Sequence, residues 1–228
     1  MRRTSSSVSI LEHEVQAYRR LGVLGGTFDP VHIGHLRCAL DVKEFLELDR
    51  VMLVPSKTPP HKPESYASAS DRYKMLKLAA LFAKELTVSD FELGQSRPSY
   101  TFYTLQHFGT NAQKLFFIIG SDAFSEIRTW HRWEEIFNIT NFAVMLRAGH
   151  EPEDIGKMLP SEITADFERQ EVGYRHRSGN MIIPVKVTKL DVSSTQVRRL
   201  VALGKSIRFL VPERVMEYIE KKRLYRPT

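Results

Sequence analysis

The sequence predicts an α/β protein with a Rossmann-like, doubly wound parallel sheet, helices on both faces of that sheet and a C-terminal helical segment. Three observations predict this fold class. Short apolar runs recur along the chain, stretches with a helical spacing of apolar residues separate them, and a glycine-rich turn follows the first run. Strands that alternate with helices in this way form parallel βαβ units, and ligands bind beyond the carboxyl ends of such strands.

Strands are expected where a brief apolar run is bounded by turn-forming residues. The first run, residues 21–24, leads directly into Gly25 and Gly26, and the run at 51–54 is closed by Pro55. Further strands are predicted at residues 86–88, 114–119, 142–146 and 182–187. Pro184 lies inside the last of these runs. Because proline cannot donate a hydrogen bond to a neighbouring strand, it fits an edge strand or an irregular strand end.

Helices are expected where apolar residues recur on one face. They are predicted at residues 34–46, 71–84, 101–108, 194–203 and 212–222. The region 70–73 offers an N-cap for the second helix, and Pro212 opens the last one. The segment 55–69 holds four prolines and is predicted to be a loop and a candidate mobile flap near the ligand. Residues 151–177 are polar, and we interpret them as a variable peripheral segment.

A single domain, residues 21–228, is expected to account for most of the chain. The 228 residues, of which 42% are hydrophobic, can bury one core, and a second full domain is not expected. Residues 1–20 are an N-terminal extension, expected to be poorly ordered or a short helix. The extension lacks the apolar run of a signal peptide, and no other stretch is apolar enough to span a bilayer. We therefore expect a cytoplasmic protein with no membrane partner.

The charge balance favours anionic partners. The formal net charge is +6, and a positive field concentrates phosphates and nucleic acids alike. The basic residues are scattered, without the dense basic arm of a dedicated nucleic-acid binder. We therefore expect a small polyphosphate ligand and no nucleic acid. Cys38 is the only cysteine, which excludes an intramolecular disulfide and a cysteine-built zinc site and fits a reducing compartment.

The most informative segment is GGTFDPVHIGH, which runs from Gly25 to His35 between the first strand and the first helix. Its glycines let the backbone approach a phosphate, and the amides and macrodipole of the helix start attract an anion. His32 and His35 are three residues apart, so both rings can point toward one spot, which Gly34 keeps open. Two imidazole donors would stabilise charge on an α-phosphate during nucleotidyl transfer. The pair could also be a metal fragment or a polar helix cap.

A second segment, DVSSTQVR at residues 191–198, lies at the start of a predicted helix. Serine and threonine at such a position are first of all N-caps. The functional interpretation is that the hydroxyls and the helix amides hold the polyphosphate of ATP. Arg198, one turn inside the helix, would then reach the phosphates that leave as pyrophosphate. The presence of the first segment favours this interpretation.

Together the two segments resemble the nucleotidylyltransferase superfamily, and four shorter ones resemble bacterial nicotinate-nucleotide adenylyltransferases in particular. These four are PPHK at 59–62, RPSYT at 97–101, IGSD at 119–122 and WHRW at 130–133. The resemblance implies transfer of the adenylyl group of ATP to nicotinic acid mononucleotide, forming deamido-NAD and pyrophosphate in NAD biosynthesis. One departure is Gln95, which stands where the family commonly has an arginine.

The resemblance also implies roles for single residues. The implied catalytic residues are His32, His35 and Arg198. The implied ATP-binding residues are Gly25, Gly26, Thr27, Phe28, His32, His35, Ser193, Ser194, Thr195 and Arg198. On the acceptor side, His61 and Lys62 would contact phosphate, Trp130 would stack on the pyridine ring, Asp122 would anchor the nucleotides, and Tyr100, Thr101 and His131 would receive the carboxylate. By spacing alone, Trp130 is more typical of packing than of a ligand platform.

Mg²⁺ is expected with ATP as co-substrate. This ion keeps several waters and binds polyphosphate oxygens, so no metal-ligating residue of the chain is expected. A monomer or a small homo-oligomer is predicted.

Other functions stay open at this point. The acceptor could be phosphopantetheine or the amide form of the mononucleotide, although Trp130 and the segment 99–101 disfavour pantetheine. From other classes, the chain could be a catalytically silent nucleotide-binding regulator or an RNA-binding protein with the same fold. The presence of both histidines disfavours silence.

Overall fold

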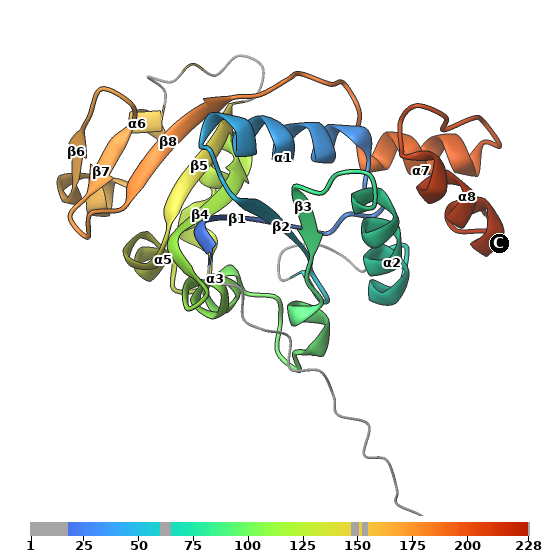
Figure 1. Cartoon of the computed structure of the whole chain (residues 1–228), viewed down its shortest axis with the longest axis horizontal. Coiled ribbons are helices and arrows are strands. Elements are labelled where there is room, and N and C mark those ends of the chain that lie inside the picture. The colour runs from blue at the N-terminus through green and yellow to red at the C-terminus, as the bar shows by residue number, and fades with distance from the viewer. Residues whose placement is uncertain (1–17, 60–64, 147–150, 152–154, 228) are drawn as a thin grey trace, which may run out of the picture.

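A sheet of eight strands forms the centre of the computed structural model, which describes residues 18–59, 65–146, 151 and 155–227 (Figure 1). The strands are β1 (Tyr18–Gly26), β2 (Arg50–Pro55), β3 (Leu86–Val88), β4 (Ala112–Gly120), β5 (Asn141–Leu146), β6 (Phe167–Arg169), β7 (Tyr174–His176) and β8 (Met181–Lys186). Their order is β3-β2-β1-β4-β5-β8-β7-β6. Neighbours from β3 to β8 pair in parallel, and β7 and β6 continue the sheet as an antiparallel hairpin.

Helices cover both faces of this sheet. The α-helices are α1 (Ile33–Phe45), α2 (Ala69–Ala80), α3 (Thr101–Gly109), α4 (Ser121–Ser125), α5 (Trp133–Ile139), α6 (Ile155–Met158), α7 (Ser194–Ala202) and α8 (Glu213–Lys222). Short 3-10 helices are η1 (Phe91–Gly94), η2 (Ile127–Thr129) and η4 (Ser161–Asp166). In Figure 1, α1 lies above the sheet, α3 and α5 lie below it, and α7 and α8 lie at the right-hand end. The predicted doubly wound parallel sheet with C-terminal helices is confirmed.

The sheet separates two apolar cores because successive residues of a strand point to opposite faces. In β4, Phe116 and Ile118 belong to one core, whereas Leu115, Phe117 and Ile119 belong to the other. The first core also takes the buried faces of α1, α2, α7 and α8, and the second takes those of α3, α4 and α5. Burial on both faces explains why the central strands read as nearly continuous apolar runs. None of the described helices is both long and apolar enough to span a bilayer.

Most of the predicted elements appear within a few residues of their expected bounds, with two differences. β1 is longer than the predicted 21–24 because its first residues already pair with β4. The N-cap of α2 is Ser68 and not a residue of the region 70–73. Ser68 Oγ accepts the N–H of Asp71 at 3.0 Å, so the helix begins at Ala69.

The predicted edge position of Pro184 is wrong for the strand as a whole, because β8 lies between β5 and β7. In the described residues, however, β7 pairs with β8 through Met181 and Ile182 alone. The carbonyl of Ile182 faces Gly173 at the hairpin, and residues two apart in a strand direct their backbone groups to the same side. The backbone nitrogen of Pro184 therefore points beyond the end of β7, where the missing N–H interrupts no hydrogen bond between strands.

The segment 151–177, predicted to be a variable peripheral segment, contributes two strands to one end of the sheet. Within it, β6 and β7 pair antiparallel, with Phe167 opposite His176. Each of these strands is only three residues long, so neither gives a clear apolar pattern in the sequence. The helices α4 and α5 between β4 and β5 are likewise absent from the sequence-based prediction.

Gly173→Ala is expected to destabilise the hairpin more than Gly179→Ala does. Both glycines have a positive φ, +80° and +92°. Each substitution is therefore expected to lower the free energy of unfolding by about 1–2 kcal/mol through backbone strain. A Cβ on Gly173 would additionally stand 1.9 Å from the Ile182 carbonyl oxygen, whereas one on Gly179 meets nothing within 4 Å. Chemical denaturation with amide exchange at Tyr174 and His176 would measure the difference. Equal losses in the two variants would contradict this packing explanation.

Candidate active site

The candidate site lies at the carboxyl ends of β1 and β4. These strands are neighbours, with Leu24 opposite Ile118. The chain nevertheless leaves them toward opposite faces of the sheet, because α1 after β1 packs on the first core and α4 after β4 packs on the second. The point where connections diverge in this way is the usual ligand position of a doubly wound sheet.

His32 and His35 lie face to face at the start of α1. Their ring centroids are 3.6 Å apart, and their planes are inclined by 25°. His35 Nδ1 accepts the N–H of His32 at 3.2 Å, and Phe28 contacts the His35 ring edge-on at 5.1 Å between centroids. Because Nδ1 is an acceptor, a neutral His35 carries its proton on Nε2. The structure thus brings both rings to one spot, as predicted, and leaves His35 with an Nε2–H of the kind that a phosphate oxygen accepts.

Gly34 makes room for its neighbours in the folded chain. A Cβ on Gly34 would lie 2.9 Å from Val192 Cγ1 and 3.1 Å from His32 Nδ1. The space beside this glycine is therefore filled by the second segment and by the histidine ring. Open space lies instead beside Gly25, where a Cβ would meet nothing within 4 Å. Gly25 is exposed at the end of β1, where a ligand can approach the backbone.

The second segment meets the first directly. Ser194 Oγ donates to the carbonyl of Pro30 at 2.8 Å, and Arg198 Nη1 donates to the carbonyl of Asp29 at 2.6 Å. Ser193 is the N-cap of α7, because its Oγ accepts the N–H of Gln196 at 3.1 Å. The capping interpretation therefore holds for Ser193, whose hydroxyl satisfies the Gln196 amide and so leaves the other amides of the first turn for a phosphate.

Arg198 is held in a fixed direction by three neighbours. Besides the bond to Asp29, its Nη2 donates to Thr195 Oγ1 at 3.1 Å, and its Cζ lies 4.4 Å from the centroid of the Tyr66 ring. A guanidinium stacked on an aromatic ring loses less freedom when it binds an anion. The half-buried Arg198 is thus preorganised beside the loop that carries the two histidines.

Sequence analysis missed the polar network under this loop. Asp29 is 4% exposed, and its carboxylate accepts the N–H groups of Tyr66 at 2.7 Å and Ala67 at 3.2 Å. Its third donor is the hydroxyl of Tyr225 at 2.7 Å. Three donors offset the desolvation of a buried carboxylate.

Arg72 is the cation of this network and is only 1% exposed. Its guanidinium donates to the carbonyls of Thr27 at 2.7 Å, Ala67 at 3.2 Å and Lys57 at 3.3 Å. Burial lowers the pKa of Arg72, and the charge of Asp29 opposes this shift, so the side chain stays charged at neutral pH. In the sequence, Arg72 is recognisable only as a charged residue on the apolar face of α2, and helical periodicity alone does not explain it.

On the acceptor side, an aromatic cluster surrounds the start of α3. Thr101 is the first residue of the helix, and Tyr100 is its N-cap. The Tyr100 ring stacks on His131 at 4.4 Å between centroids, and His131 Nε2 lies 3.3 Å from the Tyr103 hydroxyl. Arg97 covers the other ring, with Cζ 3.7 Å from the Tyr103 centroid. The structure thus brings Tyr100, Thr101 and His131 together, and it adds two residues that sequence analysis did not select.

Trp130 and Asp122 both follow β4 in the chain. Trp130 is half-buried, with its ring edge-on to Phe117 at 5.9 Å between centroids, so this side chain packs against the second core. Asp122 is exposed in the first turn of α4, directly after β4.

The predicted flap residues His61 and Lys62 lie outside the described residues. The described start of the flap is bound to the segment before α3. The N–H of Lys57 donates to Ser99 Oγ at 2.9 Å, and its Nζ donates to the Gln95 carbonyl at 2.6 Å. Gln95, which stands where the family commonly has an arginine, therefore accepts a hydrogen bond from Lys57 through its backbone carbonyl.

No group of three or more His, Cys, Asp or Glu side chains arranged to hold a metal ion occurs among the described residues.

The chain is similar to known proteins over most of its length. The cytidylyltransferase-like family model matches residues 23–200. A relative from Pseudomonas syringae pv. tomato, named probable nicotinate-nucleotide adenylyltransferase, is 43% identical over 214 residues, which cover 91% of this chain and 94% of the relative. A relative of the same name from Desulfatibacillum aliphaticivorans is 41% identical over 215 residues, with 90% and 99% covered.

Among solved structures, the nicotinic acid mononucleotide adenylyltransferase of Plasmodium falciparum, complexed with NaAD, superposes with a TM-score of 0.69. The match covers 91% of this chain and 97% of that chain at 18% identity, so it bears on the fold alone. The family model and the two curated relatives cover most of the sequence, including both junction segments. The chain therefore belongs to the cytidylyltransferase-like family and, within it, to the nicotinate-nucleotide adenylyltransferases.

Proposed function

We propose that the protein transfers the adenylyl group of ATP to nicotinic acid mononucleotide, forming deamido-NAD and pyrophosphate in NAD biosynthesis. The observation that carries the proposal is the junction of the two segments. Arg198 donates to the Asp29 carbonyl at 2.6 Å, so the histidine pair and the start of α7 face one nucleotide at the carboxyl end of the sheet. The names of the curated relatives support the acceptor.

In the proposed reaction, a phosphate oxygen of the mononucleotide attacks the α-phosphorus of ATP. The bond from that phosphorus to the bridging oxygen breaks, and pyrophosphate leaves. The attacking oxygen is already a nucleophile, so the protein supplies alignment and charge stabilisation. His32 and His35 donate to the α-phosphate, while Arg198 and the hydroxyls and amides around Ser193 hold the β- and γ-phosphates. Gly25–Phe28 line the nucleotide.

The aromatic cluster at α3 provides the acceptor side. The amide of Thr101, the first residue of α3, suits a carboxylate better than a carboxamide, because amides donate and a carboxylate only accepts, whereas the Tyr100 amide already donates to the Pro98 carbonyl at 2.8 Å. The ring of Trp130 suits a flat, electron-poor pyridine. His131 assists the carboxylate contact, Asp122 anchors the nucleotides, and His61 and Lys62 contact phosphate in this proposal.

Mg²⁺ would enter with ATP as part of the substrate. When bound, it neutralises the polyphosphate charge. A cytoplasmic location, a monomer or small homo-oligomer, and the absence of a nucleic-acid partner stay predictions.

Pyrophosphate release from ATP, with nicotinic acid mononucleotide and Mg²⁺ present, tests the function. We expect release with this acceptor to exceed release with the amide mononucleotide or phosphopantetheine at matched concentrations. Absence of release with all three acceptors would refute adenylyl transfer, and a higher rate with another acceptor would refute the substrate assignment.

His35→Ala is expected to lower kcat by about 10²- to 10³-fold, because one donor to the developing charge contributes about 3–4 kcal/mol in the transition state. His107→Ala is the matched control. That histidine stacks on Phe91 at the surface of α3, away from the junction, and its variant should keep wild-type turnover. Steady-state pyrophosphate assays on folded samples decide the matter. Wild-type turnover in His35→Ala would remove His35 from the mechanism.

Gly34→Ala is expected to lower kcat, since its Cβ would displace either His32 or Val192. The effect should be at least about tenfold, because small displacements of aligned groups are costly in rate. Gly109→Ala serves as control, since a Cβ there meets its nearest neighbour, Leu115, at an ordinary 4.0 Å. Similar rates for the two variants would show that packing at Gly34 does not set the histidine geometry.

Trp130→Ala is expected to raise the KM for nicotinic acid mononucleotide by about tenfold, the value of a stacked aromatic pair, with the KM for ATP little changed. Trp133→Ala, which removes an edge-on contact with Phe137 at 6.4 Å, is the comparison. If both variants change only protein stability, Trp130 is a packing residue.

A further inference from the structure

The C-terminal segment reaches back to the loop that carries the histidines. Tyr225 follows α8, and its hydroxyl donates to Asp29 Oδ1 at 2.7 Å across 196 residues of sequence. Tyr225 has a left-handed backbone with φ of 63°, and its ring packs with Leu224 against the first core. The phenol is thus held in position by the fold of the segment that follows α8.

Asp29 joins this tyrosine to the proposed phosphate ligand. Its carboxylate receives Tyr225 and the amides of Tyr66 and Ala67, while its main-chain carbonyl receives Arg198 at 2.6 Å. Of the two donors on Oδ1, the tyrosine at 2.7 Å is closer than the Ala67 amide at 3.2 Å. The Tyr225 hydroxyl is thus one of three donors that hold the Asp29 side chain, and the carbonyl of the same residue holds Arg198.

From this geometry, and resting on the proposed function, we infer that Tyr225 is a positioning residue for ATP. Its hydroxyl fixes Asp29, and Asp29 in turn sets the direction in which Arg198 faces the β- and γ-phosphates. Tyr225 does not need to touch the nucleotide for this role. The same Asp29 peptide precedes Pro30, whose carbonyl receives Ser194, so a shift of the loop would move two polyphosphate contacts together.

The Tyr225 hydroxyl keeps its proton, so its hydrogen bond to Asp29 persists. Burial and the Asp29 carboxylate raise the pKa of Tyr225, so the phenol stays a donor across the physiological range. Arg72 also contacts this loop, since its guanidinium donates to the Thr27 carbonyl at 2.7 Å. The loop is thus held by a buried cation and by a neutral donor from the C-terminal segment.

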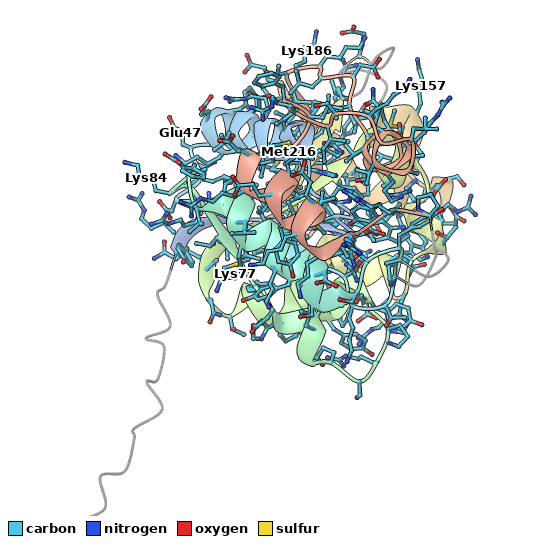
Figure 2. All side chains as sticks on the ribbon, turned by 90° about the vertical axis from the view of Figure 1, so that its right-hand side faces the viewer. Glu47, Lys77, Lys84, Lys157, Lys186 and Met216 are labelled. Carbon is cyan, nitrogen blue, oxygen red and sulfur yellow. The ribbon has the colours of Figure 1, made fainter. Side chains whose placement is uncertain are left out.

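The chain offers a matched control in Tyr218. Its hydroxyl donates to Asp71 Oδ1 at 2.8 Å, which links α8 to α2 without touching the histidine loop. Figure 2 views this end of the molecule, with Met216 on α8 and Lys77 on α2 labelled. Burial and Asp71 raise the pKa of Tyr218 to about 12, so this phenol too stays protonated. Each Tyr→Phe change therefore removes one tyrosine-to-aspartate bond from the C-terminal region.

The test compares Y225F and Y218F with the wild-type full-length protein. We measure the Kd of a non-hydrolysable ATP analogue by calorimetry, and the KM values and kcat by pyrophosphate release. Y225F should raise the Kd and the KM for ATP by about tenfold, as expected for loss of a hydrogen bond to a buried charged group, while the KM for the mononucleotide changes much less. Y218F should leave all of these near wild-type values, even if it lowers the thermal midpoint.

The inference is overturned if Y225F binds the analogue like wild type, or if Y218F weakens binding to the same extent. Should Y225F not fold, D29N carries the same expectation, because an amide group replaces one acceptor oxygen with a donor facing the phenol or the Tyr66 and Ala67 amides. Analogue binding by D29N equal to wild type would then overturn it. A wild-type protein that binds the analogue but transfers no adenylyl group contradicts the proposed function alone. A wild-type protein that does not bind the analogue contradicts both.

Discussion

The hydrogen bond from Arg198 to the carbonyl of Asp29 is the contact on which the rest of the site depends. It joins the loop after β1 to helix α7 across 169 residues of sequence. Ser194 makes a parallel contact with the next carbonyl, that of Pro30. Both acceptors belong to the main chain, so the distance between the imidazole pair and the phosphate-binding helix start follows from the backbone path of one loop. The hydrogen bonds of Asp29, Arg72 and Tyr225 hold the backbone of this loop in place.

The sheet explains why such a junction can form. β1 and β4 are adjacent and parallel, and the chain leaves them toward opposite faces, so the loops at their carboxyl ends diverge. Helix starts then converge on the same edge, and their amides add positive potential where a polyphosphate would lie. The close approach of α1 to the second segment needs Gly34, because Val192 and the His32 ring fill the space of a side chain there. The close packing at Gly34 thus occurs at the same helix start whose amides attract the phosphate.

Several structural features could not be predicted from local patterns. Arg72 breaks the apolar face of α2, yet its partners are carbonyls from three separate segments, which no spacing rule identifies. Tyr225 carries no motif at all. The strands β6 and β7 are too short to show periodicity, and the position of Pro184 depends on where its neighbour ends. Ser68 displaces the expected cap of α2 because its hydroxyl, and not a later one, reaches the free amide.

The sequence by itself determined the alternation of strands and helices, the glycine turn after the first strand, the spacing of His32 and His35 and the cap at the start of α7. These are local properties, set by side-chain periodicity, backbone freedom and hydrogen bonds over a few residues. Only the tertiary structure decided that the two segments touch, that Asp29 is buried among donors from three distant regions, and that Trp130 packs on Phe117 beside the site. Those contacts join residues far apart in the chain, and their energies depend on the burial and partners that folding alone creates.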